Sequence, residues 1–163
     1  GLTGLANHRQ FDHALLREHA RQQRTGAPLS LLMVDLDHFK HVNDRYGHAI
    51  GDDYLRAVAR VLKTSVNRAT DLAARYGGEE FVCLLPETSA TDAQMLAERI
   101  RQGVSSMALP NELASPPHLT LSIGVATLLG GKTDAAQLLA QADEQLYAAK
   151  HAGRDRVHAV VLR

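Results

Sequence analysis

The chain lacks the features that mark several large classes of protein. Its single cysteine, Cys83, excludes a disulfide bond within the chain and suits a reducing compartment. No apolar run approaches the roughly 20 residues of a membrane-spanning helix, and no signal peptide is visible. The 18 lysines and arginines balance 18 aspartates and glutamates, so the net charge does not indicate a nucleic-acid-binding surface. We therefore expect a cytoplasmic domain that contacts neither a membrane nor a nucleic acid.

The composition is that of a folded globular protein. Hydrophobic residues make up 45% of the 163 positions, which is enough for one domain with a substantial core. No internal repeat, low-complexity segment or linker divides the chain, so we expect residues 1–163 to form a single domain. The sequence opens Gly1-Leu2-Thr3 without an initiator methionine. We expect it to be a piece of a longer protein, in which an upstream sensor domain would act on the first helix.

Hydrophobic periodicity and capping residues predict an alternation of helices and strands. The first half is expected to contain a helix that Asn7 and Gln10 cap and that Gly26 ends, then a buried strand over 29–34, a polar connection over 36–48 and a helix from Gly51. A hairpin should follow, with strands over 72–76 and 81–85. The second half is expected to contain a helix capped by Thr91, a strand over 119–126, a helix capped by Asp134 and an edge strand over 156–162.

Without its two end helices, this order reads β-α-β-β-α-β. It predicts an α/β (α+β) fold of the ferredoxin-like type, with a mostly antiparallel sheet and flanking helices. In that topology the first strand lies beside the strand that leaves the hairpin. Asp35, at the end of the first strand, is therefore expected next to Glu79 and Glu80.

The stretch from Arg75 to Phe81 combines a tight turn with two carboxylates. Gly77-Gly78 suits a type I′ hairpin turn, because both central residues of that turn need positive φ. Asp35 and Asp37 alternate at the neighbouring strand end, and carboxylates crowded in this way repel one another unless a cation sits among them. Oxygen ligands favour Mg²⁺, and Lys40 just beyond could meet a phosphate. The alternative is an ordinary hairpin with a solvated acidic tip.

Several motifs, in this order and spacing, resemble those of the GGDEF family of diguanylate cyclases. They are Asp35-Leu36-Asp37-His38-Phe39-Lys40, Asn43-Asp44, Gly47-His48, Gly51-Asp52 and Arg75 to Phe81, with Leu2 to Asn7 at the start and Ser122 to Ala126, Ala142-Asp143, Tyr147, Ala149-Lys150 and Gly153-Arg154 toward the end. The match spans essentially the whole chain, which makes it far more specific than Gly-Gly-Glu-Glu-Phe alone.

The resemblance implies that two GTP molecules are condensed into cyclic di-GMP with release of two pyrophosphates. It implies that Asp35, Glu79 and the carbonyl of Leu36 hold Mg²⁺, for which Mn²⁺ can substitute, and that Glu80 helps to deprotonate the attacking 3′-hydroxyl. The remaining implied substrate contacts are Asn43 and Asp52 to the guanine edge with His48 nearby, and Lys40, Lys150, Arg154 and the backbone N–H groups of His38 and Phe39 to the phosphates.

The resemblance also implies a homodimer and a second nucleotide site. Two identical GTP molecules, one on each domain, require two domains that face each other with two-fold symmetry. Arg68 and Asp71, with Arg99 on the helix after the hairpin, match the family's product-inhibition site for cyclic di-GMP. The alternative for Arg68 and Asp71 is a surface ion pair of little energetic consequence.

Three positions depart from the family pattern. Glu79 stands where the family name has Asp, and it keeps the oxygen ligand. His8 replaces the second residue of the usual Asn-Arg-Arg opening, at little expected cost. Asp155 replaces an asparagine, which puts an anion beside Arg154 and is expected to weaken its phosphate contact.

Two other functions fit part of the pattern. A non-catalytic module could bind GTP or cyclic di-GMP and signal through contacts, but it would not need two carboxylates held together for a metal. Another nucleotidyl transferase on the same palm could use ATP. Asp52 argues against ATP, because a carboxylate accepts from the N1–H and 2-amino donors that only guanine carries.

Overall fold

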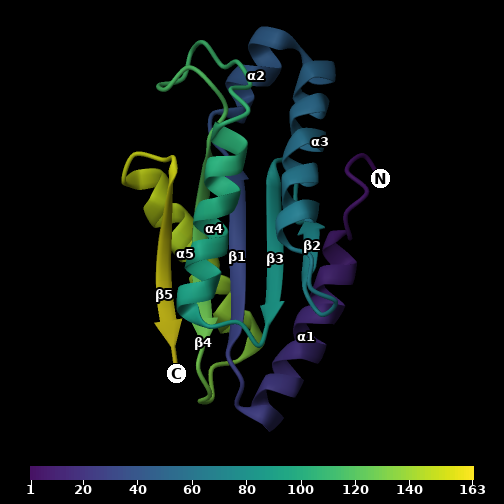
Figure 1. Ribbon diagram of the computed structural model, residues 1–163, viewed down its shortest axis with the longest axis vertical. Coiled ribbons are helices and arrows are strands. Elements are labelled where there is room, and N and C mark those ends of the chain that lie inside the picture. Colours follow the sequence, from purple (N-terminus) through teal and green to yellow (C-terminus); the bar gives the residue numbers. More distant parts are fainter.

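The computed structural model describes residues 1–163 and shows one sheet with helices on both faces (Figure 1). The helices are α1 His8–Thr25, α2 Phe39–Tyr46, α3 His48–Ser65, α4 Ala90–Ser105 and α5 Ala135–His151, and the strands are β1 Leu29–Leu36, β2 Leu72–Arg75, β3 Glu80–Pro86, β4 Leu121–Leu128 and β5 Arg156–Leu162. None of these helices has the length and apolar character that crossing a lipid bilayer requires.

The five strands lie in the order β2-β3-β1-β4-β5. Neighbours are antiparallel except for β4 and β5, which run parallel. The prediction of a ferredoxin-like β-α-β-β-α-β palm with an added edge strand is confirmed. β1 is the central strand, with β3 on one side and β4 on the other, and helices cover both of its faces.

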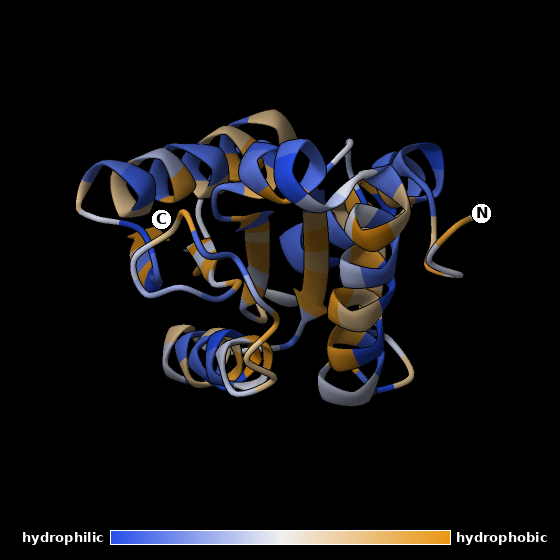
Figure 2. Ribbon diagram, turned by 90° about the horizontal axis from the view of Figure 1, so that it is seen from above, coloured by the Kyte–Doolittle hydropathy of each residue, from blue (hydrophilic) through white to orange (hydrophobic).

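The core consists of two apolar layers, one on each face of the sheet. Along β1, Leu32 and Val34 pack toward α3 and α4, whereas Leu31 and Met33 pack toward α1 and α5. This alternation explains why β1 reads as a nearly unbroken apolar run, since every side chain along it is buried. Figure 2 shows the apolar sheet between the two helical layers.

The end caps of two helices follow the sequence signals. Asn7 and Gln10 form a reciprocal capping box at the start of α1, and Gly26 ends that helix with a left-handed φ of 72°. Asp134 accepts from the backbone N–H of Gln137 at the start of α5. The predicted cap of α4 is wrong by two residues. Ser89 is the cap, and its hydroxyl accepts from the backbone N–H of Asp92.

Two predicted boundaries are also wrong. The polar connection over 36–48 contains the eight-residue helix α2, which Phe39 and Val42 anchor by burying their side chains in the core. α3 begins at His48 rather than at Gly51. A helix of two turns with only two buried residues leaves little periodicity to read, which explains why the sequence pattern missed it.

The turn between β2 and β3 has a different shape from the predicted type I′ turn. The strands end at Arg75 and resume at Glu80, so four residues link them. Neither Gly77 nor Gly78 has a positive φ. The turn is closed by the Tyr76 N–H, which donates to the Glu80 carbonyl at 2.8 Å, and by the Arg75 guanidinium, which donates to the Gly78 carbonyl at 2.6 and 3.1 Å.

Candidate active site

The end of β1, which carries Asp35, lies beside the start of β3, where Glu79 leads into Glu80, at the upper end of the sheet in Figure 1. Asp35 is the register partner of Glu80 across the antiparallel pair. The backbone N–H of Leu36 donates to the Glu79 carbonyl at 3.3 Å. The structure thus brings Asp35 next to Glu79 and Glu80, as the topology predicted. It does so because cross-strand partners share one face of the sheet.

Asp35 is buried and paired with a lysine from α5. The residue is 4% exposed, one carboxylate oxygen forms an ion pair with Lys150, and the other oxygen has no hydrogen-bond partner. The pKa of Asp35 is raised to about 6, with burial as the largest cause; the Lys150 hydrogen bond and charge oppose the rise, and the charges of Glu79 and Glu80 add to it. A buried carboxylate oxygen without a partner is a site that a cation would stabilise.

The residues present fit a magnesium ion that substrate helps to hold. Asp35 and Leu36 at the end of β1 and Glu79 just before β3 carry oxygen atoms on adjacent segments, and hard cations prefer oxygen ligands. No three His, Cys, Asp or Glu side chains converge closely enough to hold a metal ion by themselves. Mg²⁺ typically keeps several waters and binds through one or two carboxylates plus substrate phosphates, so this sparse protein set is in keeping with it.

Glu80 faces an open cavity on the α5 side of the sheet. The cavity measures about 420 Å³ and is lined by Met33, Tyr76, Glu80, Ala136, Leu139, Ala140 and Asp143. Burial raises the pKa of Glu80, Lys150 lowers it, and the carboxylates of Asp143 and Glu79 raise it again. A carboxylate with a raised pKa is a better proton acceptor than an ordinary one when it is ionised.

The predicted phosphate-binding turn lies at the start of α2. His38 precedes the helix with a left-handed φ of 52°, and Phe39 anchors the first turn in the core. Lys40 projects into solvent and pairs with Asp44 at 2.7 Å. Because this ion pair is highly exposed, it holds Lys40 only weakly, and the ammonium is free to meet an anion.

Asn43 and Gly51 come together where α2 meets α3. A Cβ on Gly51 would lie 1.9 Å from the Asn43 amide oxygen, so only glycine leaves room for that side chain. Asp52, the next residue, is half-buried on α3, and His48 is exposed at the start of the same helix. The two side chains predicted to read guanine therefore lie on neighbouring helices.

The turn after α5 carries Arg154, another of the predicted phosphate ligands. Arg154 is exposed, and its charge is the second cause, after burial, of the lowered pKa of His38. The neighbouring Asp155 forms its ion pair with a residue other than Arg154. Its carboxylate accepts from Arg101 of α4 at 2.6 Å.

Asp37 is not part of the carboxylate cluster, although the sequence placed it beside Asp35. Its buried side chain accepts from the hydroxyls of Thr120 and Ser122 at 2.7 and 2.6 Å and from the backbone N–H of Asp155 at 3.1 Å. β1 ends at Leu36, so the strand alternation that would pair Asp37 with Asp35 has stopped by that point.

The predicted inhibitory residues line one pocket on the α3–α4 side. Arg68 donates to both carboxylate oxygens of Asp71, at 3.2 and 3.1 Å, and to the Pro86 carbonyl at 2.8 Å. Arg68, Asp71 and Arg99 share a pocket of about 220 Å³. The structure thus brings Arg68 and Asp71, which lie between α3 and β2, into one pocket with Arg99 of α4.

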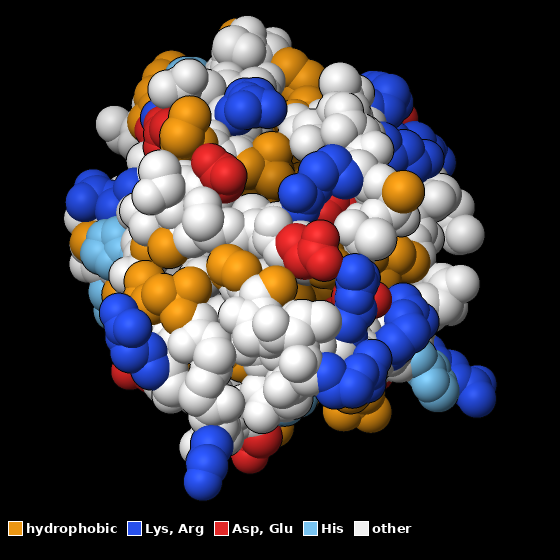
Figure 3. Space-filling model, turned by 60° about the horizontal axis from the view of Figure 1, so that its bottom comes forward, with side chains coloured by type: hydrophobic (Ala, Val, Ile, Leu, Met, Phe, Trp, Pro, Cys, Tyr) orange, Lys and Arg blue, Asp and Glu red, His pale blue; other side chains and the backbone are white.

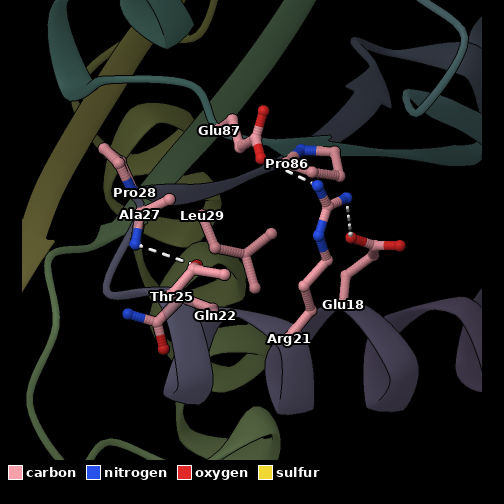
Figure 4. Close-up of a pocket in the computed structure, with 9 residues that line it drawn as sticks. All are labelled: Glu18, Arg21, Gln22, Thr25, Ala27, Pro28, Leu29, Pro86 and Glu87. Atoms are coloured by element: carbon pink, nitrogen blue, oxygen red, sulfur yellow. Dashed lines mark hydrogen bonds and ion pairs between the residues drawn. The ribbon is translucent and has the colours of Figure 1, made fainter.

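A further hollow lies at the opposite end of the sheet and holds none of the predicted site residues (Figure 4). It is lined by Glu18, Arg21, Gln22, Thr25, Ala27, Pro28, Leu29, Pro86 and Glu87, and its volume of about 10 Å³ has room for little more than one water molecule. Figure 3 brings the lower end of the molecule forward and shows positive and negative side chains interspersed there.

Sequence reasoning missed the contact between the start of α1 and the Gly-Gly turn. The His8 ring stacks on Tyr76 at 4.0 Å between centroids, and its Nδ1 lies 2.9 Å from the Tyr76 carbonyl. Phe11 meets the same tyrosine edge to face. Tyr76, an aromatic residue next to the Gly-Gly turn, was the only hint of this contact in the sequence. Nothing in the sequence identifies His8, 68 residues away, as its partner.

Comparison with known proteins agrees with this geometry. Residues 1–156 match the family described as "Diguanylate cyclase, GGDEF domain". The chain is 43% identical over 156 residues to diguanylate cyclase DosC of Escherichia coli and 44% identical over 160 residues to response regulator PleD of Caulobacter vibrioides. Each alignment covers 96% of this chain and 34% of the relative.

Solved structures of the same family are also similar. The GGDEF domain of DgcB from Caulobacter crescentus, solved in complex with c-di-GMP, superposes with a TM-score of 0.89 at 38% identity and covers 98% of this chain and 90% of that one. The active GGEEF domain of a Vibrio cholerae diguanylate cyclase gives 0.87 at 34% identity, with coverage of 95% and 97%. The chain therefore belongs to the GGDEF family of diguanylate cyclases, and it spans about a third of the length of the curated relatives it matches.

Proposed function

We propose that this domain condenses two GTP molecules into cyclic di-GMP and releases two pyrophosphates. Family membership supports this reaction. The structural observation that carries the proposal is the pairing of Asp35 with Glu80 at the end of the sheet, with one buried oxygen of Asp35 left without a partner. A purely structural domain would gain nothing from an unpaired buried carboxylate oxygen, because such a group lowers its stability.

Asp35, Glu79 and the Leu36 carbonyl would hold Mg²⁺ or Mn²⁺. When bound, the ion supplies positive charge that stabilises the attacking oxygen and the leaving pyrophosphate. Lys150 now neutralises Asp35 through their ion pair. With a cation held by Asp35, the Lys150 ammonium would be free for the β- and γ-phosphates. Arg154, Lys40 and the backbone N–H groups of His38 and Phe39 would contact the same phosphates.

Guanine would be held where α2 meets α3. The Asp52 carboxylate would accept from the N1–H and 2-amino groups of guanine, and the Asn43 side-chain amide would hydrogen-bond to the guanine edge, with His48 nearby. Adenine lacks the N1–H and 2-amino donors, so it would leave the Asp52 carboxylate unpaired in a half-buried site. Glu80 would take the proton of the 3′-hydroxyl, and its raised pKa suits this role.

The reaction needs two copies of the domain. One domain holds one GTP, so the 3′-hydroxyl of each nucleotide must reach the α-phosphorus of the other across a two-fold axis. We further propose that cyclic di-GMP binds the pocket of Arg68, Asp71 and Arg99 and inhibits the enzyme. Arginine suits this ligand because its planar guanidinium makes paired hydrogen bonds to guanine and phosphate.

We also propose a setting for the domain. Residues 1–163 would act as one GGDEF unit of a longer cytoplasmic protein, and an upstream sensor domain would set the geometry of the dimer. The contact of His8 with Tyr76 supports a route for this control, because it joins the start of α1 to the turn that carries Glu79 and leads into Glu80.

The test is product formation by the purified domain. Incubation with Mg²⁺ and GTP followed by chromatography should give cyclic di-GMP and pyrophosphate, and ATP should give no cyclic product. Glu80→Gln should abolish turnover while GTP binding remains, since glutamine keeps the shape but cannot accept the proton. GTP binding without any product would indicate a non-catalytic module, and a cyclic product from ATP would indicate a different nucleotidyl transferase.

A further inference from the structure

The turn that follows α5 has an unusual backbone. Gly153, Arg154 and Asp155 have φ values of 123°, 63° and 47° in succession. Glycine adopts positive φ freely, but two consecutive residues with side chains do so only when their surroundings hold them there. Arg154 is the residue of this turn that would meet the substrate phosphates, so whatever holds the turn also aims its guanidinium.

Asp37 holds the turn from the sheet. It is 3% exposed, and its two carboxylate oxygens accept three hydrogen bonds. Two come from the hydroxyls of Thr120 and Ser122, beside and within β4, and the third comes from the backbone N–H of Asp155 at 3.1 Å. One buried carboxylate therefore joins the end of β1, the start of β4 and the strained turn.

An ion pair holds the same turn from α4. The Asp155 carboxylate accepts from Arg101 at 2.6 Å, and Arg101 is itself braced by Glu98 at 2.9 Å on the same helix. Both partners are largely shielded from solvent, with side-chain exposures of 19% for Arg101 and 30% for Asp155. Arg101 supplies the positive charge that balances the Asp155 carboxylate. Because Asp155 pairs with Arg101, its carboxylate is not paired with Arg154.

We propose that Asp37 and the Arg101–Asp155 ion pair are positioning residues that hold the Gly153–Asp155 turn in its left-handed form and thereby direct Arg154 at the β- and γ-phosphates of the substrate. The inference rests on the proposed function in taking GTP as that substrate. The influence of Arg154 on His38 agrees with it, because the arginine must lie close to the turn whose backbone N–H groups would bind the same phosphates.

The test compares two nucleotides that differ only in these phosphates. Binding of GTP and of GMP is measured by calorimetry with Mg²⁺, using the catalytically silent Glu80→Gln background. Asp37→Asn should weaken GTP binding about tenfold, the order that one charge-assisted hydrogen bond supplies, and leave GMP binding unchanged. Arg101→Gln should change GTP binding in the same direction by a smaller factor, because Asp37 still holds the backbone of the turn.

Two controls separate positioning from general damage. Ser30→Ala removes a buried polar contact between β1 and β4 at the far end of the same strands, where the Ser30 hydroxyl lies 2.7 Å from that of Thr127. It should lower stability without altering the ratio of GTP to GMP affinity. In the Arg154→Ala background, Asp37→Asn should cause no further loss of GTP affinity, since the group that it positions is gone.

Several results would overturn the inference. These are an equal loss of GTP and GMP affinity in Asp37→Asn, an unchanged GTP affinity, or losses that add independently to that of Arg154→Ala. If Asp37→Asn does not fold, Arg101→Gln tests the inference by the same criteria. A domain that binds GTP more tightly than GMP yet makes no cyclic di-GMP would contradict the proposed function and leave this inference standing. Equal affinity for the two nucleotides would overturn the inference itself.

Discussion

Replacing Asp35 by asparagine should stabilise the metal-free domain at neutral pH. Asp35 is 4% exposed, and one of its oxygens has no hydrogen-bond partner. Burial is the largest cause of its raised pKa, and the attraction of Lys150 does not offset it. Asparagine has nearly the same shape and carries no charge, so Asp35→Asn removes the cost of burying the carboxylate. Lys150 loses its partner but remains partly exposed, so water can solvate its ammonium.

The size and pH dependence of this effect follow from the pKa of Asp35. The folded protein raises this pKa from 3.8 to about 6, a rise of about two units that corresponds to about 3 kcal/mol at most. The folded state therefore binds the proton more tightly than the unfolded state. Stability from this group is fully present below the unfolded pKa of 3.8 and is lost as the pH rises through about 6. Asp35→Asn should thus match the wild type near pH 4 and exceed it above pH 7.

The assay is urea unfolding in EDTA at about pH 4 and about pH 7.5, where the two protonation states of Asp35 dominate. Asp37→Asn is the matched control, because it makes the same change two residues away in an equally buried carboxylate that has three donors. It should destabilise the domain at the higher pH by about 1–3 kcal/mol, since buried donors lose their acceptor. A destabilised Asp35→Asn variant, or a gain that does not change with pH, would refute the reasoning.

Three further predictions concern the proposed sites. Gly51→Ala should displace the Asn43 side chain, whose amide oxygen would lie 1.9 Å from the new Cβ, and should weaken GTP binding at least tenfold in calorimetry, whereas Gly103→Ala, with its nearest contact at 3.3 Å, should not. Specific activity should rise with enzyme concentration because catalysis needs a dimer, and activity strictly proportional to enzyme down to nanomolar levels would contradict this. Arg68→Ala should remove cyclic di-GMP binding and product inhibition while leaving the uninhibited rate unchanged, and an unaltered affinity for the product would end the idea of an inhibitory site there.

Local signals accounted for much of the fold. The capping box of Asn7 and Gln10 involves residues three apart, so its geometry is encoded in a single turn of chain. The apolar run of β1 indicated a buried strand, because an unbroken apolar run of that length is typical of a strand in the core. The same approach failed for α2, whose eight residues bury only Phe39 and Val42.

The sequence by itself determined the order of the elements apart from α2, the palm topology and the motif spacing that brings Asp35 beside Glu80. Only the tertiary structure decided which charged groups meet: Lys150 pairs with Asp35 across 115 residues, Asp37 turns toward β4 instead of joining the carboxylates, and Arg101 takes the Asp155 carboxylate. Propensity, periodicity and capping act over a few residues and can be read along the chain. The choice of an ionic partner depends on how strands and helices far apart in sequence come to lie side by side, and that is settled when the core packs.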